Sequence, residues 1–463
     1  MHKRLPQAVQ LLLLLLLVFG AAARSLNAQE EFPNVRLGLV YDPNAERPGL
    51  AFPPLSARFG GEAITDGVGA ILARDLRYSD RFELIDSLPP EMVEDGTVNY
   101  GVWDRLGAVW LLNGQVEGSG AGYVLALELH DVVYRERKQR GRFQLPLPES
   151  DEFRMAVHAV SDAIVEWITG EPGMAASRIA FSRRDADGNQ DLWTVDADGE
   201  NLRRVTRYGT ITLSPTWSPD GGRLAFTSYK DGPARIYELD LVSGSEKAVP
   251  GIDDAMFLTP TYHPDGQHLA FGVAGGGSGG LYTYDIGRGC CLERLTNARR
   301  YDDISPSYSP DGARLTYMTS RLAGEAAPQI FVMPSSGGEG ELLSPFDIRE
   351  RGYYTSPDWS PFGDRIVFHG RIERGRYQIL VAEVGRGRAR SLVQLTREGQ
   401  NEDPSWAPDG RHIVFVGERS NGTGLWVVDA VSGRVRLVVP NIRARAPEWS
   451  PRLVSAAGNI LRN

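Results

Sequence analysis

Oxygen-bearing side chains alternate along one short segment of the sequence, in a spacing that can surround a calcium ion. The segment contains Asp185, Asp187, Asn189 and Asp191, each separated from the next by one residue. An EF-hand loop arranges its ligands in a similar way, but it also needs a glycine at its sixth position and a bidentate glutamate at its twelfth. This segment has neither. It is therefore only a weak calcium candidate, and a polar turn between two strands is the favoured interpretation.

Neither the glycine run around Ser278 nor the histidines of the sequence indicate a catalytic site. Ser278 lies between glycines in the run Gly276–Gly280, which matches the nucleophile elbow of hydrolases, but no helix pattern follows it. The histidines form no HExxH pair of the kind that binds catalytic zinc. The sequence therefore predicts no catalytic residue, no resident metal and no cofactor, and we expect a protein that is not an enzyme.

The charge and cysteine content narrow the functional classes further. The chain has 50 Lys and Arg against 59 Asp and Glu, a formal net charge of −9, which argues against nucleic acid as a partner. Its two cysteines, Cys290 and Cys291, are adjacent. Neighbouring residues of a strand point to opposite faces, so we expect no disulfide between them, and two thiols are too few for a structural zinc site.

One repeated motif organises the second part of the chain. In its first copy, Pro215 precedes Trp217, which is followed by the turn Pro219-Asp220-Gly221 and a short apolar strand. Proline and glycine favour a tight turn, and the aromatic residue is placed to pack between neighbouring units. The first prolines of the six copies are Pro215, Pro260, Pro306, Pro357, Pro404 and Pro447. Their spacing of about 43 to 51 residues is typical of one β-propeller blade.

The two ends of this repeat region complement each other. Residues 177–206 contain the later strands of a blade without the strand that carries the proline, whereas the last copy, at Pro447, contains only that strand. Together they predict one composite blade, which closes a six-bladed propeller over residues 177–452 and removes free sheet edges. Residues 453–463 are then a C-terminal tail.

The loops that enter the first strand of each blade are the best candidates for binding. By alternation we expect their side chains to line one mouth of the central channel, where mixed aromatic and charged residues suit a protein partner. The candidates are Phe257, Asp303, Tyr354, Asn401, Glu402 and Arg445.

The part before the propeller has a mixed α/β pattern. Apolar residues between Ile64 and Leu76 follow a helical stripe, Leu125 to Leu129 alternate as in a half-buried strand, and a last helix, capped by Ser150, stops near Gly170. The sequence therefore predicts a small α/β domain over residues 29–170 and a linker over 171–176.

The first 28 residues have the features of a cleaved secretory signal peptide. Lys3 and Arg4 precede an apolar run and a stretch of small residues that ends at Ala23, and a second possible cleavage point follows Ala28. The apolar run is shorter than a membrane span. We therefore expect a secreted protein whose signal peptide is removed.

Several segments resemble the TolB family. The stretches 64–82 and 162–173 are similar to the first and last helices of that family's N-terminal domain, 99–108 and 127–132 also look like it, and the six repeats resemble its propeller. The resemblance covers nearly the whole chain after residue 28. It implies a periplasmic, monomeric component of the Tol-Pal system, which supports envelope integrity and cell division. In that family the mature N-terminus engages TolA and one propeller mouth receives the lipoprotein Pal.

Two other classes of function remain as alternatives. Six-bladed propellers also occur in hydrolases, which would need an added catalytic domain or a ring of carboxylates and histidines in the channel. A propeller can also serve as a glycan-binding module, and identification of the bound partner would separate that function from the Tol-Pal one.

Overall fold

The computed structural model describes residues 47–86, 98–120, 122–275, 277–298, 300–322, 327–346, 352–373, 375–385, 389–420 and 422–454. The predicted signal peptide, most of the tail and Gly276 lie outside these residues. The elements and contacts below all belong to the described residues.

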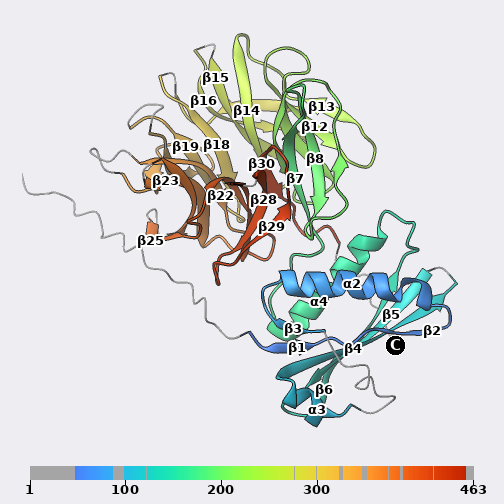
Figure 1. Cartoon of the computed structure of the whole chain (residues 1–463). Helices are drawn as coiled ribbons and strands as arrows, with labels where there is room; N and C mark the ends of the chain where they lie inside the picture. The colour runs from blue at the N-terminus through green and yellow to red at the C-terminus, as the bar shows by residue number, and fades with distance from the viewer. Residues whose placement is uncertain are drawn as a thin grey trace, which may run out of the picture. The chain divides into compact units, whose positions relative to one another are not determined.

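The first part of the chain folds as a sheet with two long helices against one face. β1 and β3 pair in parallel, β1 and β2 each pair in parallel with β4, and β4, β5 and β6 follow as antiparallel neighbours, so that the order is β3-β1-β4-β5-β6 (Figure 1). The strands are β1 (Gly49–Ala51), β2 (Ser56–Arg58), β3 (Glu83–Ile85), β4 (Ala108–Ser119), β5 (Gly122–Asp131) and β6 (Glu136–Leu145).

The predicted helical stripes form the core of this domain. Helices α2 (Glu62–Tyr78) and α4 (Phe153–Thr169) pack their buried apolar faces against Leu125, Leu127 and Leu129 of β5. A short helix, α3 (Tyr100–Arg105), contributes Trp103 to a separate apolar cluster. Helix α4 ends at Gly170 in the left-handed conformation, as predicted, but it begins after Glu152 and Ser150 is not its N-cap. The mixed α/β class is confirmed.

Six four-stranded sheets follow. Five are built from consecutive strands, which is the radial arrangement that the repeats predict (Figure 1). The inner strands that open these blades are β10 (Thr212–Trp217), β14 (Ala255–Tyr262), β18 (Asp303–Tyr308), β22 (Tyr353–Trp359) and β26 (Gln400–Trp406). The remaining strands are β11 (Arg223–Ser228), β12 (Arg235–Asp240), β13 (Glu246–Ala248), β15 (His268–Gly275), β16 (Gly280–Asp285), β17 (Cys290–Arg294), β19 (Arg314–Thr319), β20 (Gln329–Pro334), β21 (Glu341–Leu342), β23 (Arg365–Glu373), β24 (Arg376–Val384), β25 (Ala389–Gln394), β27 (His412–Arg419), β28 (Gly422–Asp429) and β29 (Val435–Val439).

The sixth blade joins the two ends of the propeller. β30 (Ala444–Trp449) pairs antiparallel with β7 (Arg178–Arg184), which continues into β8 (Gln190–Asp196) and β9 (Arg203–Arg204). The indole of Trp449 donates a 2.7 Å hydrogen bond to Ser177 Oγ, 272 residues away in sequence. The composite blade predicted from the truncated repeats is therefore confirmed, and its backbone pairing closes the ring.

Neighbouring blades meet through the repeated aromatic residues. Arg314 lies 4.7 Å from the ring centre of Trp359 in the next blade, and Arg365 lies 5.2 Å from that of Trp406. Stacking of an arginine on an aromatic ring adds an electrostatic attraction to the burial of apolar surface. The glycine of the turn that follows the aromatic residue is expected to allow a positive φ. In the first copy, Gly221 has a φ of 71°.

The expectation that the two cysteines do not bridge is wrong. Cys290 and Cys291 form a disulfide in β17. Cys291 has a φ of 66°, which breaks the regular alternation of the strand and lets neighbouring side chains turn toward each other.

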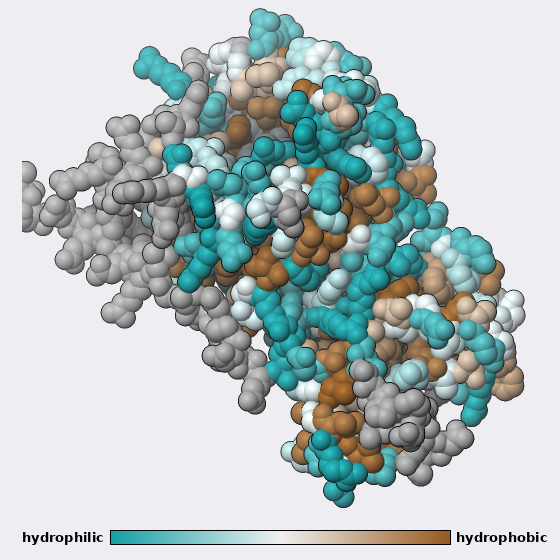
Figure 2. All heavy atoms as spheres, in the orientation of Figure 1, coloured by the Kyte–Doolittle hydropathy of each residue, from teal (hydrophilic) through white to brown (hydrophobic). Residues whose placement is uncertain are grey.

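The described surface is mixed in polarity. Hydrophilic residues cover most of the face in Figure 2, interrupted by smaller apolar areas. Among the described residues, no helix is both long and apolar enough to cross a bilayer.

The closing blade provides a test of the ring. Replacing Trp449 with alanine removes a nearly buried indole and its hydrogen bond to Ser177, so we expect the free energy of unfolding to fall by about 3–5 kcal/mol. Chemical denaturation followed by tryptophan fluorescence and circular dichroism measures this loss. The control Val242→Ala changes a side chain that is 94% exposed and should leave stability unchanged. An equal effect of both variants would contradict the closing role of Trp449.

Candidate partner-binding channel and interdomain network

A cavity lies where the six inner strands meet. Its volume is about 430 Å³, and residues around the first proline of all six repeats line it. Each inner strand has a register shift at this point, which moves two residues out of the regular ladder. The lining prolines are Pro215, Pro260, Pro306, Pro357, Pro404 and Pro447.

The residue before each of these prolines has a left-handed backbone. The φ values lie between 44° and 53°, a region that few residues other than glycine adopt. Proline suits the bulge because it has no N–H group that would otherwise need a partner in the ladder. The six left-handed residues are Ser214, Thr259, Ser305, Ser356, Asp403 and Ala446.

This bulge explains where the predicted binding residues lie. Each residue three positions before a proline points into its blade and is buried: Phe257, Asp303, Tyr354 and Asn401. Phe257 packs on Phe271 at 5.0 Å between ring centres, and Tyr354 packs on Phe368 at 5.7 Å. Regular alternation along the strand would have placed these side chains at the mouth, and the structure instead places them in the cores of the blades.

The two buried polar candidates are held by neighbouring side chains. Asp303 accepts a 2.7 Å hydrogen bond from Thr296, and burial raises the pKa of its carboxyl group. Asn401 donates a 2.9 Å hydrogen bond to Gln378 and accepts one of 3.0 Å from Arg419. These contacts give both residues a clear structural role inside the sheets.

The position two residues before the proline reaches the channel in two of the six copies. Arg445 and Leu213 line the cavity, and Glu402 forms a 3.0 Å ion pair with Arg445. The sequence analysis selected only the two charged residues. The equivalent residues of three other copies, Leu258, Ile304 and Thr355, are half-buried, and Ile304 packs against the apolar core that its blade shares with the next. Counting from the repeat proline in every copy would have found Leu213.

The carboxylates of Asp358 and Glu448 line the channel, and a buried histidine lies in the strand next to one of the bulges. Asp358 accepts hydrogen bonds from the backbone N–H of Trp406, at 2.7 Å, and from Ser307 Oγ, at 3.1 Å. Burial nevertheless raises the pKa of Asp358 to about 6, and burial together with the charge of Asp358 raises the pKa of Glu448. Burial lowers the pKa of His369, whose Nδ1 accepts a hydrogen bond from the backbone N–H of Asp403.

The weak calcium candidate does not gather its four oxygens around one point. Asp191 is buried and accepts hydrogen bonds from Thr206 and Arg204, while Asp185 and Asp187 are exposed. Asn189 donates to Asp185 at 3.4 Å. These contacts are those of a polar turn.

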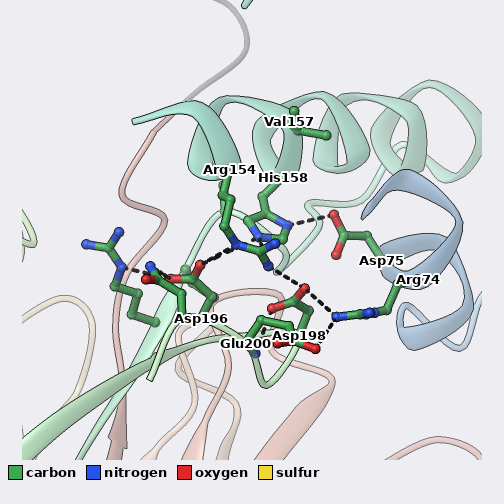
Figure 3. A network of polar contacts seen from close by, with 12 residues as sticks. Arg74, Asp75, Arg154, Val157, His158, Asp196, Asp198 and Glu200 are labelled. Atoms are coloured by element: carbon green, nitrogen blue, oxygen red, sulfur yellow. Dashed lines mark hydrogen bonds and ion pairs between the residues drawn. The ribbon is translucent and has the colours of Figure 1, made fainter. Parts of the chain in front are cut away.

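A second polar cluster joins the α/β domain to the propeller (Figure 3). From α4, Arg154 donates to Asp198 at 2.6 Å and to Asp196 at 3.2 Å. His158, fully buried on the same helix, lies 2.8 Å from Asp75 of α2. The contacts of Arg154 cross from the first domain to the composite blade, and the contact of His158 joins α4 to α2. The network therefore holds the first domain against the composite blade.

Three of these residues have ligand atoms close enough to hold a metal ion. The oxygens of Asp75 and Asp198 and a ring nitrogen of His158 lie within 4.8 Å of one another, and this is the one such group among the described residues. However, Arg154 and Arg74 already pair with Asp198, and their charges would repel a divalent cation. The arrangement therefore favours an ion-pair network.

A similar cluster lies at a second contact between the domains. Asp80, just after α2, accepts from His412 at 3.4 Å and lies 3.5 Å from Arg434. Asp409 contacts the other ring nitrogen of His412 at 2.7 Å. Burial opposes the charged form of His412, but Asp409 and Asp80 outweigh it and raise its pKa.

The segment predicted as a linker is held tightly. Asp162 of α4 accepts hydrogen bonds from the backbone N–H groups of Ala175, at 2.7 Å, and Ala176, at 3.0 Å. Burial raises the pKa of this carboxyl group to about 7, although both hydrogen bonds oppose the shift. The connection between the domains is therefore an ordered, hydrogen-bonded segment.

Together, the fold and the channel define a class of protein: a six-bladed propeller with an α/β domain that contacts two of its blades and a channel lined by the six repeat prolines. The family model described as the TolB beta propeller domain matches residues 165–453, and that of the TolB amino-terminal domain matches residues 39–138. The chain belongs to the TolB family.

Individual relatives agree with this assignment. The chain is 31% identical over 205 residues to the Tol-Pal system protein TolB of Methylococcus capsulatus, and 33% identical over 196 residues to that of Nitrosomonas europaea. These matches span 42% of this chain and about half the length of the relatives, 47% and 45%. The crystal structure of TolB from Acinetobacter baumannii has the same fold, with a TM-score of 0.76 and 24% identity over 89% of this chain and 98% of that one.

The buried histidine of the network predicts a pH dependence. Burial works against the charge of His158, but Asp75, Asp198 and Asp196 outweigh it and raise its pKa above 6.5. A raised histidine pKa stabilises the fold fully below 6.5, and this contribution is lost as pH rises through the folded pKa. The difference in unfolding free energy between the unmodified protein and His158→Gln should therefore shrink from pH 6.5 upward, as measured by urea denaturation. Val242→Ala, at a side chain that is 94% exposed and does not titrate, is the control and should show no such trend.

The raised pKa of Asp358 predicts that replacing this residue stabilises the protein, the opposite of the effect expected for His158. Because its folded pKa is about 6 and its ordinary value is 3.8, the folded state holds this proton more tightly than the unfolded state. The carboxylate therefore costs stability progressively between pH 3.8 and 6, by at most about 3 kcal/mol. Asp358→Asn should gain stability relative to the unmodified protein across this range. The exposed turn variant Asp364→Asn is the control, and a flat difference for Asp358→Asn would contradict the shift.

Proposed function

We propose that this protein is a periplasmic component of the Tol-Pal system that works by binding other proteins and has no enzymatic activity. The observation that carries this proposal is its membership of the TolB family through both domains. The relatives at 31% and 33% identity carry the name Tol-Pal system protein TolB. The signal-like segment at residues 1–28 supports export to the periplasm.

Pal, the peptidoglycan-associated lipoprotein, is the partner we assign to the channel mouth. Leu213 lines the cavity and offers apolar surface that a partner can remove from water. Arg445 also lines it, and its ion pair with Glu402 can orient a polar partner segment. An apolar and a charged contact at one mouth suit one protein surface bound in one orientation.

A TolA-like inner-membrane protein is the second partner, and we assign it to the mature N-terminus. Two partners at separate sites would let the protein couple the outer membrane to the inner membrane during division. If the two sites are separate, a change at one site should leave binding at the other unaffected.

Binding experiments test both assignments. We expect Leu213→Asp, at a residue that lines the cavity, to weaken binding of Pal from the same source by at least about tenfold, because it places a charge in an apolar contact. Isothermal titration calorimetry measures this loss. The control Val242→Asp makes the same change at a residue that is 94% exposed elsewhere on the propeller and should bind normally.

A deletion of residues 29–40 tests the second site. The shortened protein should still bind Pal and should lose binding to the TolA-like protein. Failure of the intact protein to bind Pal would overturn the assignment of the mouth. The mature protein would then be screened against glycans and hydrolase substrates, the functions of other propellers.

A further inference from the structure

The hairpin that joins β5 and β6 carries a dense group of positive charges at the edge of the first domain. β6 is the outermost strand of its sheet (Figure 1). Between residues 135 and 142 the chain has one carboxylate, Glu136, and five cations. The cations are Arg135, Arg137, Lys138, Arg140 and Arg142. This local excess contrasts with the net charge of −9 of the whole chain.

Three of the five cations lack a paired carboxylate. Arg137 pairs with Glu128 and Arg142 pairs with Glu117, each at 2.8 Å. Within the described part of the chain, no carboxylate lies within 4.0 Å of the charged groups of Arg135, Lys138 or Arg140, and all three residues are exposed. Their charge is therefore available to a partner.

The turn next to these cations presents apolar side chains to water. Val133 is 61% exposed and Tyr134 is 77% exposed. The turn is ordered, because Val132 is buried and Asp131 accepts a 2.9 Å hydrogen bond from the backbone N–H of Tyr134. The hairpin thus has an apolar tip with a collar of cations directly behind it. We call residues 132–142 the basic hairpin.

We propose that the basic hairpin is a docking surface for the anionic phospholipid headgroups of a membrane. Arginine and lysine gain electrostatic energy beside such headgroups, while tyrosine favours the boundary between the headgroups and the acyl chains. The tip and the collar match these two layers. Val133 and Tyr134 enter the interface, and Arg135, Lys138 and Arg140 contact phosphates.

The position of the apolar residues separates a lipid surface from an acidic polypeptide as the partner. A peptide that added to the edge of the sheet would lie along β6 and pair with its backbone. Such a peptide would leave Val133 and Tyr134 in water, because they lie in the turn before β6 begins at Glu136. A membrane surface contacts the tip and the collar together.

The acidity of the whole protein sets the orientation of this contact. An anionic membrane repels most of the protein and attracts the basic hairpin, so the hairpin approaches first. The attraction is screened by salt because the cations are exposed. Docking is therefore reversible and weakens as ionic strength rises.

Vesicle sedimentation tests the proposal with the full chain after residue 28. The probes are vesicles of equal parts phosphatidylglycerol and phosphatidylcholine, and vesicles of phosphatidylcholine alone. We expect binding to the anionic vesicles only. The triple variant Arg135→Gln, Lys138→Gln, Arg140→Gln should bind roughly 100-fold more weakly, since each cation near an anionic surface contributes about a fivefold effect.

A control variant with the same change in net charge tests whether binding depends on the cations of the hairpin or on the net charge of the protein. Lys247→Gln, Arg288→Gln, Arg376→Gln removes three exposed cations from the propeller and should bind like the unmodified protein. Tyr134→Ser, which keeps every charge, should weaken binding several-fold. Thermal unfolding by circular dichroism checks that each variant is folded.

The other outcomes would overturn the proposal. These are equal binding of the two triple variants, binding that does not depend on phosphatidylglycerol, and no binding to either vesicle. Soluble polyglutamate is the last probe. Binding of polyglutamate at the hairpin without binding of anionic vesicles would identify the surface as a peptide site instead.

Discussion

The seam between neighbouring blades is the constraint on which the rest of the structure depends. A four-stranded blade has two apolar faces, and both can be buried only if the next blade covers them. The repeated aromatic residues do this, with Trp359 and Trp406 under arginines of the preceding blades. The last blade must borrow β30 from the end of the chain, so Trp449 bonds to Ser177 and the ring closes.

The same inner strands also create the channel. The left-handed residue before each proline ends the regular ladder, and the proline that follows needs no hydrogen-bond donor there. Six such bulges surround the cavity, and residues beside them, such as Leu213 and Arg445, line it. A feature repeated for architecture thus also forms the lining of the channel, whose chemistry differs from blade to blade.

The α/β domain is fixed to this ring by charge. Arg154 and His158 on α4 share Asp196 and Asp198 with the composite blade, and Asp80 receives His412 and Arg434 at the second contact. Buried ion pairs are stabilising only when their geometry and hydrogen bonds offset the loss of water. The ordered linker adds backbone hydrogen bonds from Ala175 and Ala176 to Asp162 of α4.

The sequence by itself determined the number of blades, the composite closure and the mixed first domain, because turn residues and hydrophobic periods recur at fixed spacing. Tertiary structure alone decided which residues reach the channel. Phe257, Asp303, Tyr354 and Asn401 are buried because a left-handed bulge, invisible in an alternating pattern, lies between them and the repeat proline. The interdomain network was also hidden, since Asp75, His158 and Asp198 are far apart in sequence and only packing brings their charges together. The disulfide of Cys290 and Cys291 likewise depends on the local backbone at Cys291.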